Sequence, residues 1–145
     1  EDFNHIRVPV PDTPNALLLP HLQPALRAIE EARRQGGTVV VHCKAGVSRS
    51  PAVVLAFLVQ FCGMSLLEAL EFTRSRRPQV SPNSGFISQL VRLEATLRHG
   101  RVTLDAEKYA MDRFSAPVPS PGSPPPATVA TLGSRNKEQQ QLVGW

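Results

Sequence analysis

The sequence is poor in cysteine: among its 145 residues only Cys43 and Cys62 carry a thiol. The residues between them predict a helix, and roughly 12 residues of helix would hold the two sulfurs on the order of 18 Å apart. That separation is too large for a disulfide. Both cysteines are therefore expected to be free thiols, which suits a reducing compartment, the cytoplasm or alternatively the nucleus.

Long apolar runs are also missing. No stretch reaches the length of about 18 residues that a helix needs to cross a bilayer, and no secretory signal is visible. These absences exclude a membrane-spanning protein from the expected classes. The chain does not begin with Met, so we expect a fragment or a processed chain.

Neither the histidines nor the charge indicate a metal or a polynucleotide. His5, His21 and His99 are scattered without metal-like spacing, so we expect no metal and no other cofactor. The net charge of +4 favours anionic partners only modestly. An ordinarily solvated surface is the simpler interpretation, and no nucleic-acid partner is expected.

The most informative stretch joins a short strand to a helix. Thr38 to Val41 is β-branched throughout and apolar on both faces, as in strands buried between helices. A helix is predicted from about Ser48 to Cys62 and is apolar nearly all round, which is typical of the middle of a core. Pro51 fits the first turn of this helix, where a missing N–H costs nothing.

The loop between strand and helix forms a cradle for an anion of phosphate size. Its N–H groups and the dipole of the following helix converge on one spot, and Arg49 offers a bidentate grip on two oxygens. Cys43 stands at the floor of the cradle, where these groups lower its pKa and make the thiolate a nucleophile. Gly46 is expected to allow either a backbone angle or a close approach that other residues resist. The residues expected to offer mainly backbone N–H groups are Lys44, Ala45, Gly46, Val47 and Ser48. The simpler alternative is a buried cysteine with a surface arginine nearby.

The predicted order of strand, helix, strand and helix indicates an α/β fold. The cradle lies at the carboxyl end of a strand, where open α/β sheets place ligands. The first of the other predicted elements is a strand at His5–Val10, whose prolines indicate a sheet edge or a strand end. It is followed by a loop at Pro11–Asn15, a helix at His21–Gln35, a helix that begins with a capping box at Ser65, and a helix that opens at Ser81-Pro82-Asn83 and closes near Gly100. The last of these has a predicted apolar stripe of Phe86, Ile87, Leu90, Leu93 and Leu97.

Arg74, Arg76 and Arg77 are interpreted as a solvated helix end, with a phosphosubstrate patch as the alternative.

The segment VHCKAGVSRSPAVVLAFL resembles the phosphate-binding signature of the cysteine-dependent protein phosphatases, and AGVSRS resembles their dual-specificity branch. The resemblance runs from about Phe3 to Gly100. It implies a mainly parallel central sheet flanked by helices, with residues 1–100 forming the C-terminal two-thirds of a catalytic domain whose first strands are missing. It also implies a metal-free reaction on phosphoproteins through a phosphocysteine.

The resemblance assigns roles to four further residues. Asp12 corresponds to the general acid that protonates the leaving oxygen and then activates water; from the residues alone, a plain turn aspartate is an equal alternative. Ser50 corresponds to the hydroxyl that stabilises the departing thiolate. His42 corresponds to a residue that tunes the cysteine pKa, and Asn83, in SPNSGF, to one that braces the loop. Their structural alternatives are a helix-turn serine, an ordinary histidine and a helix cap.

Residues 101–145 are predicted to form a separate, largely disordered tail. Arg101 to Phe114 is weakly helical at best, and the prolines between Pro117 and Pro126 favour extended polyproline structure. Such a segment is a candidate ligand for an SH3 or WW domain.

Three functions are open at this point. The first is a dual-specificity protein phosphatase. The second is a phosphoinositide or RNA phosphatase, which is disfavoured because Val47 and Ser50-Pro51 depart from the loops of those enzymes. The third is an inactive phosphatase that binds phosphosites as a scaffold. The presence of Cys43, Arg49 and Asp12 disfavours it, whereas the expected lack of the first strands of the domain favours it.

Overall fold

The computed structural model describes residues 4–115 and 140–144, which contain three parallel strands. The strands are β1 (Asn4–Arg7), β2 (Thr38–Val41) and β3 (Gln140–Gly144), and their order in the sheet is β1-β3-β2. β3 comes from the far end of the chain and pairs with both neighbours, so that Val143 is the partner of Ile6 on one side and of Val41 on the other. The first strand lies at an edge of the sheet that the described residues form, and it ends at Arg7, before Pro9. Both agree with the alternatives that its prolines left open, although the strand is shorter than expected.

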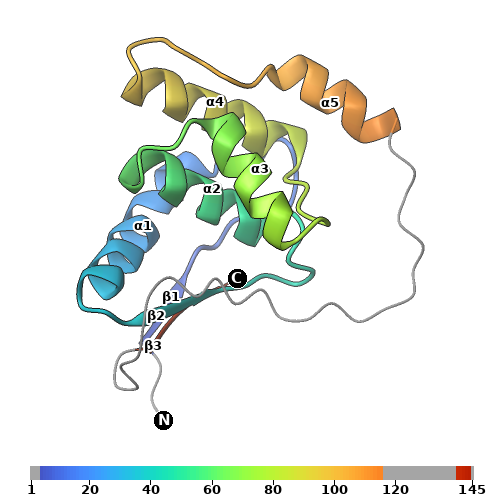
Figure 1. The fold of residues 1–145 in the computed structure, drawn as a ribbon. Coiled ribbons are helices and arrows are strands. Elements are labelled where there is room, and N and C mark those ends of the chain that lie inside the picture. The colour runs from blue at the N-terminus through green and yellow to red at the C-terminus, as the bar shows by residue number, and fades with distance from the viewer. Residues whose placement is uncertain (1–3, 116–139, 145) are drawn as a thin grey trace.

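The described helices lie on one side of this sheet (Figure 1). They are α1 (Leu19–Arg34), α2 (Arg49–Phe61), α3 (Leu66–Arg76), α4 (Ser84–Leu97) and α5 (Ala106–Ser115). The burial of β2 agrees with this arrangement, because Val39 and Val41 are buried whereas Thr38 and Val40 are partly exposed. We expected β2 to be buried on both faces; the described helices cover only one of them.

α2 is the helix around which the others pack, as its apolar sequence predicts. Leu55, Ala56 and Phe57 are almost completely buried, and α2 contacts α1, α3, α4 and β2. Burying a large apolar side chain stabilises a fold by about 1.5–3 kcal/mol. The core therefore fixes the direction of α2 and, with it, the place of the loop that precedes the helix.

The ends of the helices follow local signals that the sequence displays. Ser65 caps α3 in a capping box: its side chain accepts the Glu68 N–H at 3.2 Å, and the Glu68 carboxylate accepts the Ser65 N–H at 2.8 Å. α1 begins two residues earlier than predicted, with Pro20 in its first turn, where no N–H is required.

One position of the predicted stripe on α4 is wrong. Leu97 is 43% exposed, whereas Glu94 is fully buried. The Glu94 carboxylate accepts hydrogen bonds from the N–H groups of Leu66 and Thr103 and from the Thr103 hydroxyl, and it lies 3.5 Å from Arg98. These partners supply the polar contacts that a buried carboxylate needs, so a glutamate occupies a core position of the helix.

The segment that follows residue 100 contains a regular helix, α5, where we expected at most a weakly helical stretch. α5 packs against α4, and Tyr109 is buried with its hydroxyl donating to the Pro82 carbonyl at 2.7 Å. β3 lies in the sheet. The proline-rich part of the tail, with its predicted SH3 or WW ligand, lies outside the described residues. Among the described residues, no helix is long and apolar enough to cross a membrane.

Candidate active site

The loop that joins β2 to α2 brings Cys43 close to the start of the helix. Gly46 has a φ of +64°, a left-handed conformation, which is the first of the two alternatives expected for this glycine. This conformation directs the Gly46 N–H back toward the cysteine, where it donates to Sγ at 3.2 Å. The Cys43 Sγ also lies 3.2 Å from the Ser50 hydroxyl, in the first turn of α2.

These contacts lower the pKa of the Cys43 thiol. Partial burial of the side chain acts against ionisation, but hydrogen bonds from the Ser50 side chain and from the N–H groups of Ser50, Gly46 and Ala45 outweigh it. Ser50 is almost completely buried, so its hydroxyl has a fixed position beside the sulfur. The site therefore favours a thiolate at the floor of the loop.

The other predicted loop residues differ in their exposure to solvent. Arg49 is the first residue of α2 and is half-buried, while Lys44 and Ala45 are exposed. The Val47 carbonyl accepts the Ser81 N–H at 2.8 Å. His42 is exposed, and its predicted influence on the cysteine stays a prediction.

Asp12 is joined to the loop through Asn83. The Asn83 side-chain amide donates to the Asp12 carboxylate at 3.0 Å, and the Asn83 backbone N–H donates to the Ser48 hydroxyl at 2.8 Å. The Asn83 side chain also caps α4 by accepting the Phe86 N–H. The Asn83 side chain thus caps α4 and binds Asp12, while the contact with the loop is made by its backbone N–H.

The start of α4 approaches the Asp12 loop so closely that only glycine fits. A Cβ atom on Gly85 would lie 1.8 Å from the Pro14 carbonyl oxygen. Further along, the Gln89 side chain accepts the Leu18 N–H at 2.7 Å and donates to the Ala16 carbonyl at 2.8 Å. α4 and its N-cap therefore hold Asp12 and the residues that follow it, up to Leu18. The sequence signal for the close contact between α4 and the Asp12 loop was the SPNSGF segment, which contains Gly85. We assigned a role there only to Asn83.

Arg77 is a site residue that the sequence interpretation missed. It is buried, and its guanidinium donates to the Gly46 carbonyl at 3.1 Å and to the Ala45 carbonyl at 3.2 Å. The prediction of a solvated arginine cluster is therefore wrong for this residue. The physical reason is that α3 ends at Arg76, so the backbone of Arg77 is extended and its side chain leaves the helix surface.

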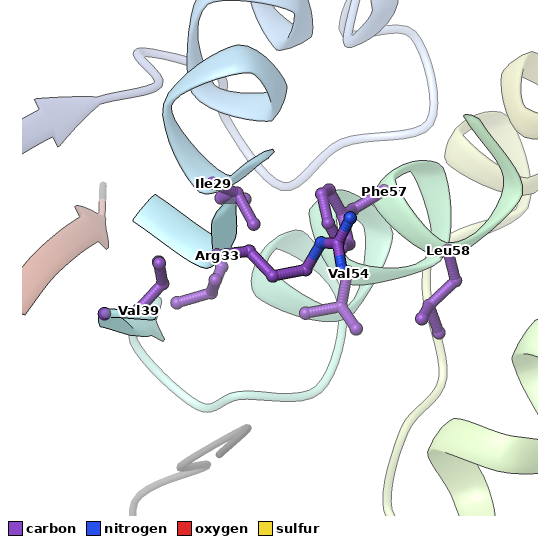
Figure 2. Close-up of a pocket in the computed structure, with 8 residues that line it drawn as sticks. Ile29, Arg33, Val39, Val54, Phe57 and Leu58 are labelled. Carbon is purple, nitrogen blue, oxygen red and sulfur yellow. The ribbon is translucent and has the colours of Figure 1, made fainter. Parts of the chain in front are cut away.

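An apolar pocket lies elsewhere, between α1, β2 and α2. Figure 2 shows Arg33 of α1 reaching across it toward Val54 and Phe57 of α2. No residue of the 42–48 loop lines this pocket, so it is separate from the candidate site. Among the described residues, no group of three or more potential ligands is placed to hold a metal.

Comparison with known proteins shows that this loop lies within a domain of a known family. Residues 1–96 match the family described as "Dual specificity phosphatase, catalytic domain". The chain is 43% identical over 97 residues to human dual specificity protein phosphatase 18, covering 67% of this chain and 52% of that protein. It spans about half the length of the curated relatives it matches.

Two solved structures resemble this fold. The crystal structure of human DUSP28 is 46% identical, with a TM-score of 0.63 over 65% of this chain and 66% of that one. A mouse putative dual specificity phosphatase "complexed with zinc tungstate" is 47% identical, with a TM-score of 0.63 over 65% of this chain and 59% of that one. The arrangement of strand, loop and helix around Cys43 thus occurs within a domain of known type.

Proposed function

Because the chain belongs to the dual specificity phosphatase catalytic-domain family, we propose that it hydrolyses phosphotyrosine and phosphoserine or phosphothreonine in proteins through a phosphocysteine. The observation that carries this proposal is the environment of Cys43. Its sulfur lies 3.2 Å from the Ser50 hydroxyl and 3.2 Å from the Gly46 nitrogen, at the N-terminus of α2. These groups favour a thiolate at a place suited to phosphate oxygens.

In the first step, the Cys43 thiolate attacks phosphorus from the side opposite the ester oxygen. A phosphorus–sulfur bond forms while the bond to the ester oxygen breaks. The leaving oxygen takes the proton of Asp12, so that a neutral hydroxyl departs. Arg49 and the loop N–H groups bind the phosphate oxygens, whose charge they stabilise in the transition state.

In the second step, water hydrolyses the phosphocysteine. The Asp12 carboxylate takes a proton from the water, whose oxygen bonds to phosphorus as the phosphorus–sulfur bond breaks. The electron pair returns to Cys43, and the Ser50 hydroxyl donates to the thiolate that leaves. The products are inorganic phosphate and the enzyme in its starting state, with Asp12 protonated again.

The mouse relative solved with tungstate supports an oxyanion site of this kind, because tungstate is a tetrahedral anion like phosphate. Asp12 is exposed but held by Asn83, which suits a group that must reach a substrate bound over the loop. The position of Arg49 at the first turn of α2 suits a ligand that spans helix terminus and side chain.

The test is a pH series between about 5 and 8 on the full chain with a chelator present, because catalytic pKa values near this range shape the profile. We expect wild-type protein to hydrolyse an aryl phosphate, a phosphotyrosyl peptide and a phosphothreonyl peptide, and Cys43→Ser to hydrolyse none of them. Asp12→Ala should lose on the order of 10²–10⁴-fold on the peptides and much less on an aryl phosphate, whose leaving group needs little protonation. A folded wild-type chain that hydrolyses none of the three would overturn the proposal.

A further inference from the structure

We propose that Arg77 is a positioning residue that holds the peptide groups of the phosphate loop so that their N–H groups face the bound anion. Arg77 follows the last residue of α3 and is only 7% exposed. Its Nε donates to the Gly46 carbonyl at 3.1 Å, and its Nη2 donates to the Ala45 carbonyl at 3.2 Å. One rigid guanidinium therefore binds two consecutive loop carbonyls.

The consequence follows from the planar trans peptide bond, in which the carbonyl and the following N–H point in opposite directions. Holding the Ala45 carbonyl against Arg77 directs the Gly46 N–H to the other side, and the Gly46 N–H does point at the Cys43 Sγ at 3.2 Å. By the same geometry, holding the Gly46 carbonyl fixes the direction of the Val47 N–H. Arg77 thus orients donors that it does not touch.

The hydrogen bonds from Arg77 hold the loop backbone at its most flexible residue, Gly46. Gly46 has a φ of +64°, and a glycine leaves the adjoining peptide planes freer to rotate than any other residue does. The next carbonyl, of Val47, is held by the Ser81 N–H at 2.8 Å. Three successive carbonyls of the loop are therefore bound by residues of the 77–81 segment.

The neighbouring arginines provide a comparison within the same helix end. Arg74 donates to the Val80 carbonyl at 2.9 Å and lies over the Tyr109 ring. Arg76 is exposed and lies over the Phe72 ring. Within this arginine cluster, Arg77 donates the hydrogen bonds to the loop carbonyls. Replacing Arg76 removes the same positive charge without removing these bonds, so Arg76 is a matched control.

The role rests on the proposed function, but it is tested by two readouts that need no turnover. The first is the pH midpoint for alkylation of Cys43 by iodoacetamide in a Cys62→Ser background. The second is the affinity for tungstate, measured as protection of Cys43 from alkylation. Arg77→Ala should move the alkylation midpoint to higher pH and weaken tungstate binding by roughly tenfold, as expected when a charge-assisted hydrogen bond is lost. Arg76→Ala should leave both unchanged.

Two further variants separate geometry from charge and protect the test against misfolding. Arg77→Lys keeps the charge but not the planar fork, and Arg77→Gln keeps neutral donors; we expect each to weaken tungstate binding less than Arg77→Ala does. Each is assayed below its own melting temperature. The proposal would be overturned if folded Arg77→Ala protein kept the wild-type alkylation midpoint and tungstate affinity. If Arg77→Ala does not fold, the same result in both Arg77→Lys and Arg77→Gln would overturn it. A wild-type chain that binds tungstate without turnover would instead contradict the proposed function and leave this test intact.

Discussion

The two ends of α2 carry the two cysteines of the chain, in opposite surroundings. Cys43 precedes the N-terminus, where the 77–83 segment binds the loop from outside. Cys62 caps the C-terminus and is exposed. There the chain turns away through Gly63, and the Met64 N–H donates to the Leu58 carbonyl at 3.2 Å. The first end is held by a distant part of the chain, and the second by its own backbone.

The pKa values of the two thiols move in opposite directions. For Cys62, displacement of water around the sulfur raises the pKa; Arg33 acts against this shift and Glu30 adds to it. Displacement of water acts in the same sense on Cys43, so burial does not explain the difference. The hydrogen bonds from Ser50, Gly46 and Ala45 reverse the effect at Cys43. The helix dipole adds to the contrast, because it favours an anion at the N-terminus and disfavours one at the C-terminus.

Among changes at the N-terminal end that keep the Cys43 thiol, removing the Ser50 hydroxyl should give the largest loss of activity. A hydrogen bond to a charged group is worth about 1.5–3 kcal/mol, so Ser50→Ala should slow hydrolysis of the phosphocysteine by roughly tenfold to a hundredfold. The pH midpoint for alkylation of Cys43 should also rise. Steady-state and burst kinetics on an aryl phosphate measure the first effect. Ser88→Ala, which removes a helical hydroxyl bonded to the Ser84 carbonyl, is the control; a wild-type alkylation profile in Ser50→Ala would contradict the assignment.

Loss of the Asn83 side chain should affect both catalysis and stability. Asn83→Ala removes the N-cap of α4, which costs about 1 kcal/mol, and releases Asp12 from its hydrogen bond. We expect turnover of a phosphotyrosyl peptide to fall on the order of tenfold, a part of what the general acid contributes. Ser65→Ala is the matched control, because it removes the N-cap of α3 at a similar cost without touching Asp12. Equal activity losses in the two variants would show that Asn83 acts only through stability.

The sequence predicted the N-terminal end of α2 well because the signals there are local. The strand, the glycine, Cys43, Arg49 and the helix follow one another within a short stretch, and each supports the same interpretation. The capping box at Ser65 is local in the same sense. What depends on contacts between distant segments was harder to predict. The carbonyls that Arg77 binds belong to residues 31 and 32 positions earlier in the chain, and three neighbouring arginines gave no sign of which one turns inward.

The sheet was still harder to predict, because its central strand comes from a distant part of the chain. β3 comes from a glutamine-rich end of the chain whose only adjacent apolar residues are Leu142 and Val143, too short a run to predict a central strand. The burial of Glu94 could not be predicted from the sequence for a different reason. Periodicity places it beside the apolar stripe of α4, and only the partners supplied by Leu66 and Thr103 make a buried carboxylate tolerable.

The opposite pKa shifts predict opposite effects of pH on stability. The folded pKa of Cys43 is lowered, so its contribution is present above the ordinary thiol value and is lost as pH falls through the lowered one. The folded pKa of Cys62 is raised, so stability falls as pH rises from the ordinary value toward the raised one. Melting temperatures of wild type, Cys43→Ser and Cys62→Ser from about pH 6 to 10 measure both, since unperturbed thiols titrate near pH 8.5.

As pH rises, the melting temperature of wild type relative to Cys43→Ser should increase, and that of wild type relative to Cys62→Ser should decrease. The same contrast applies to reactivity: near neutral pH, iodoacetamide should alkylate Cys43 faster than Cys62, although Cys62 is the more exposed. Parallel pH curves for the two variants would contradict the assignment of opposite environments to the two ends of α2.

The smallest effect is expected from a change at the C-terminal end. Gly63 has a φ of +69°, and no atom lies within 4 Å of where a Cβ would be placed. Gly63→Ala therefore meets no steric clash, and its cost is the left-handed backbone conformation alone, about 1 kcal/mol. The melting temperature should fall by several degrees, while the alkylation midpoint of Cys43 and turnover of an aryl phosphate stay at wild-type values. A change in Cys43 reactivity would mean that α2 transmits strain along its length, and the two ends would no longer be independent.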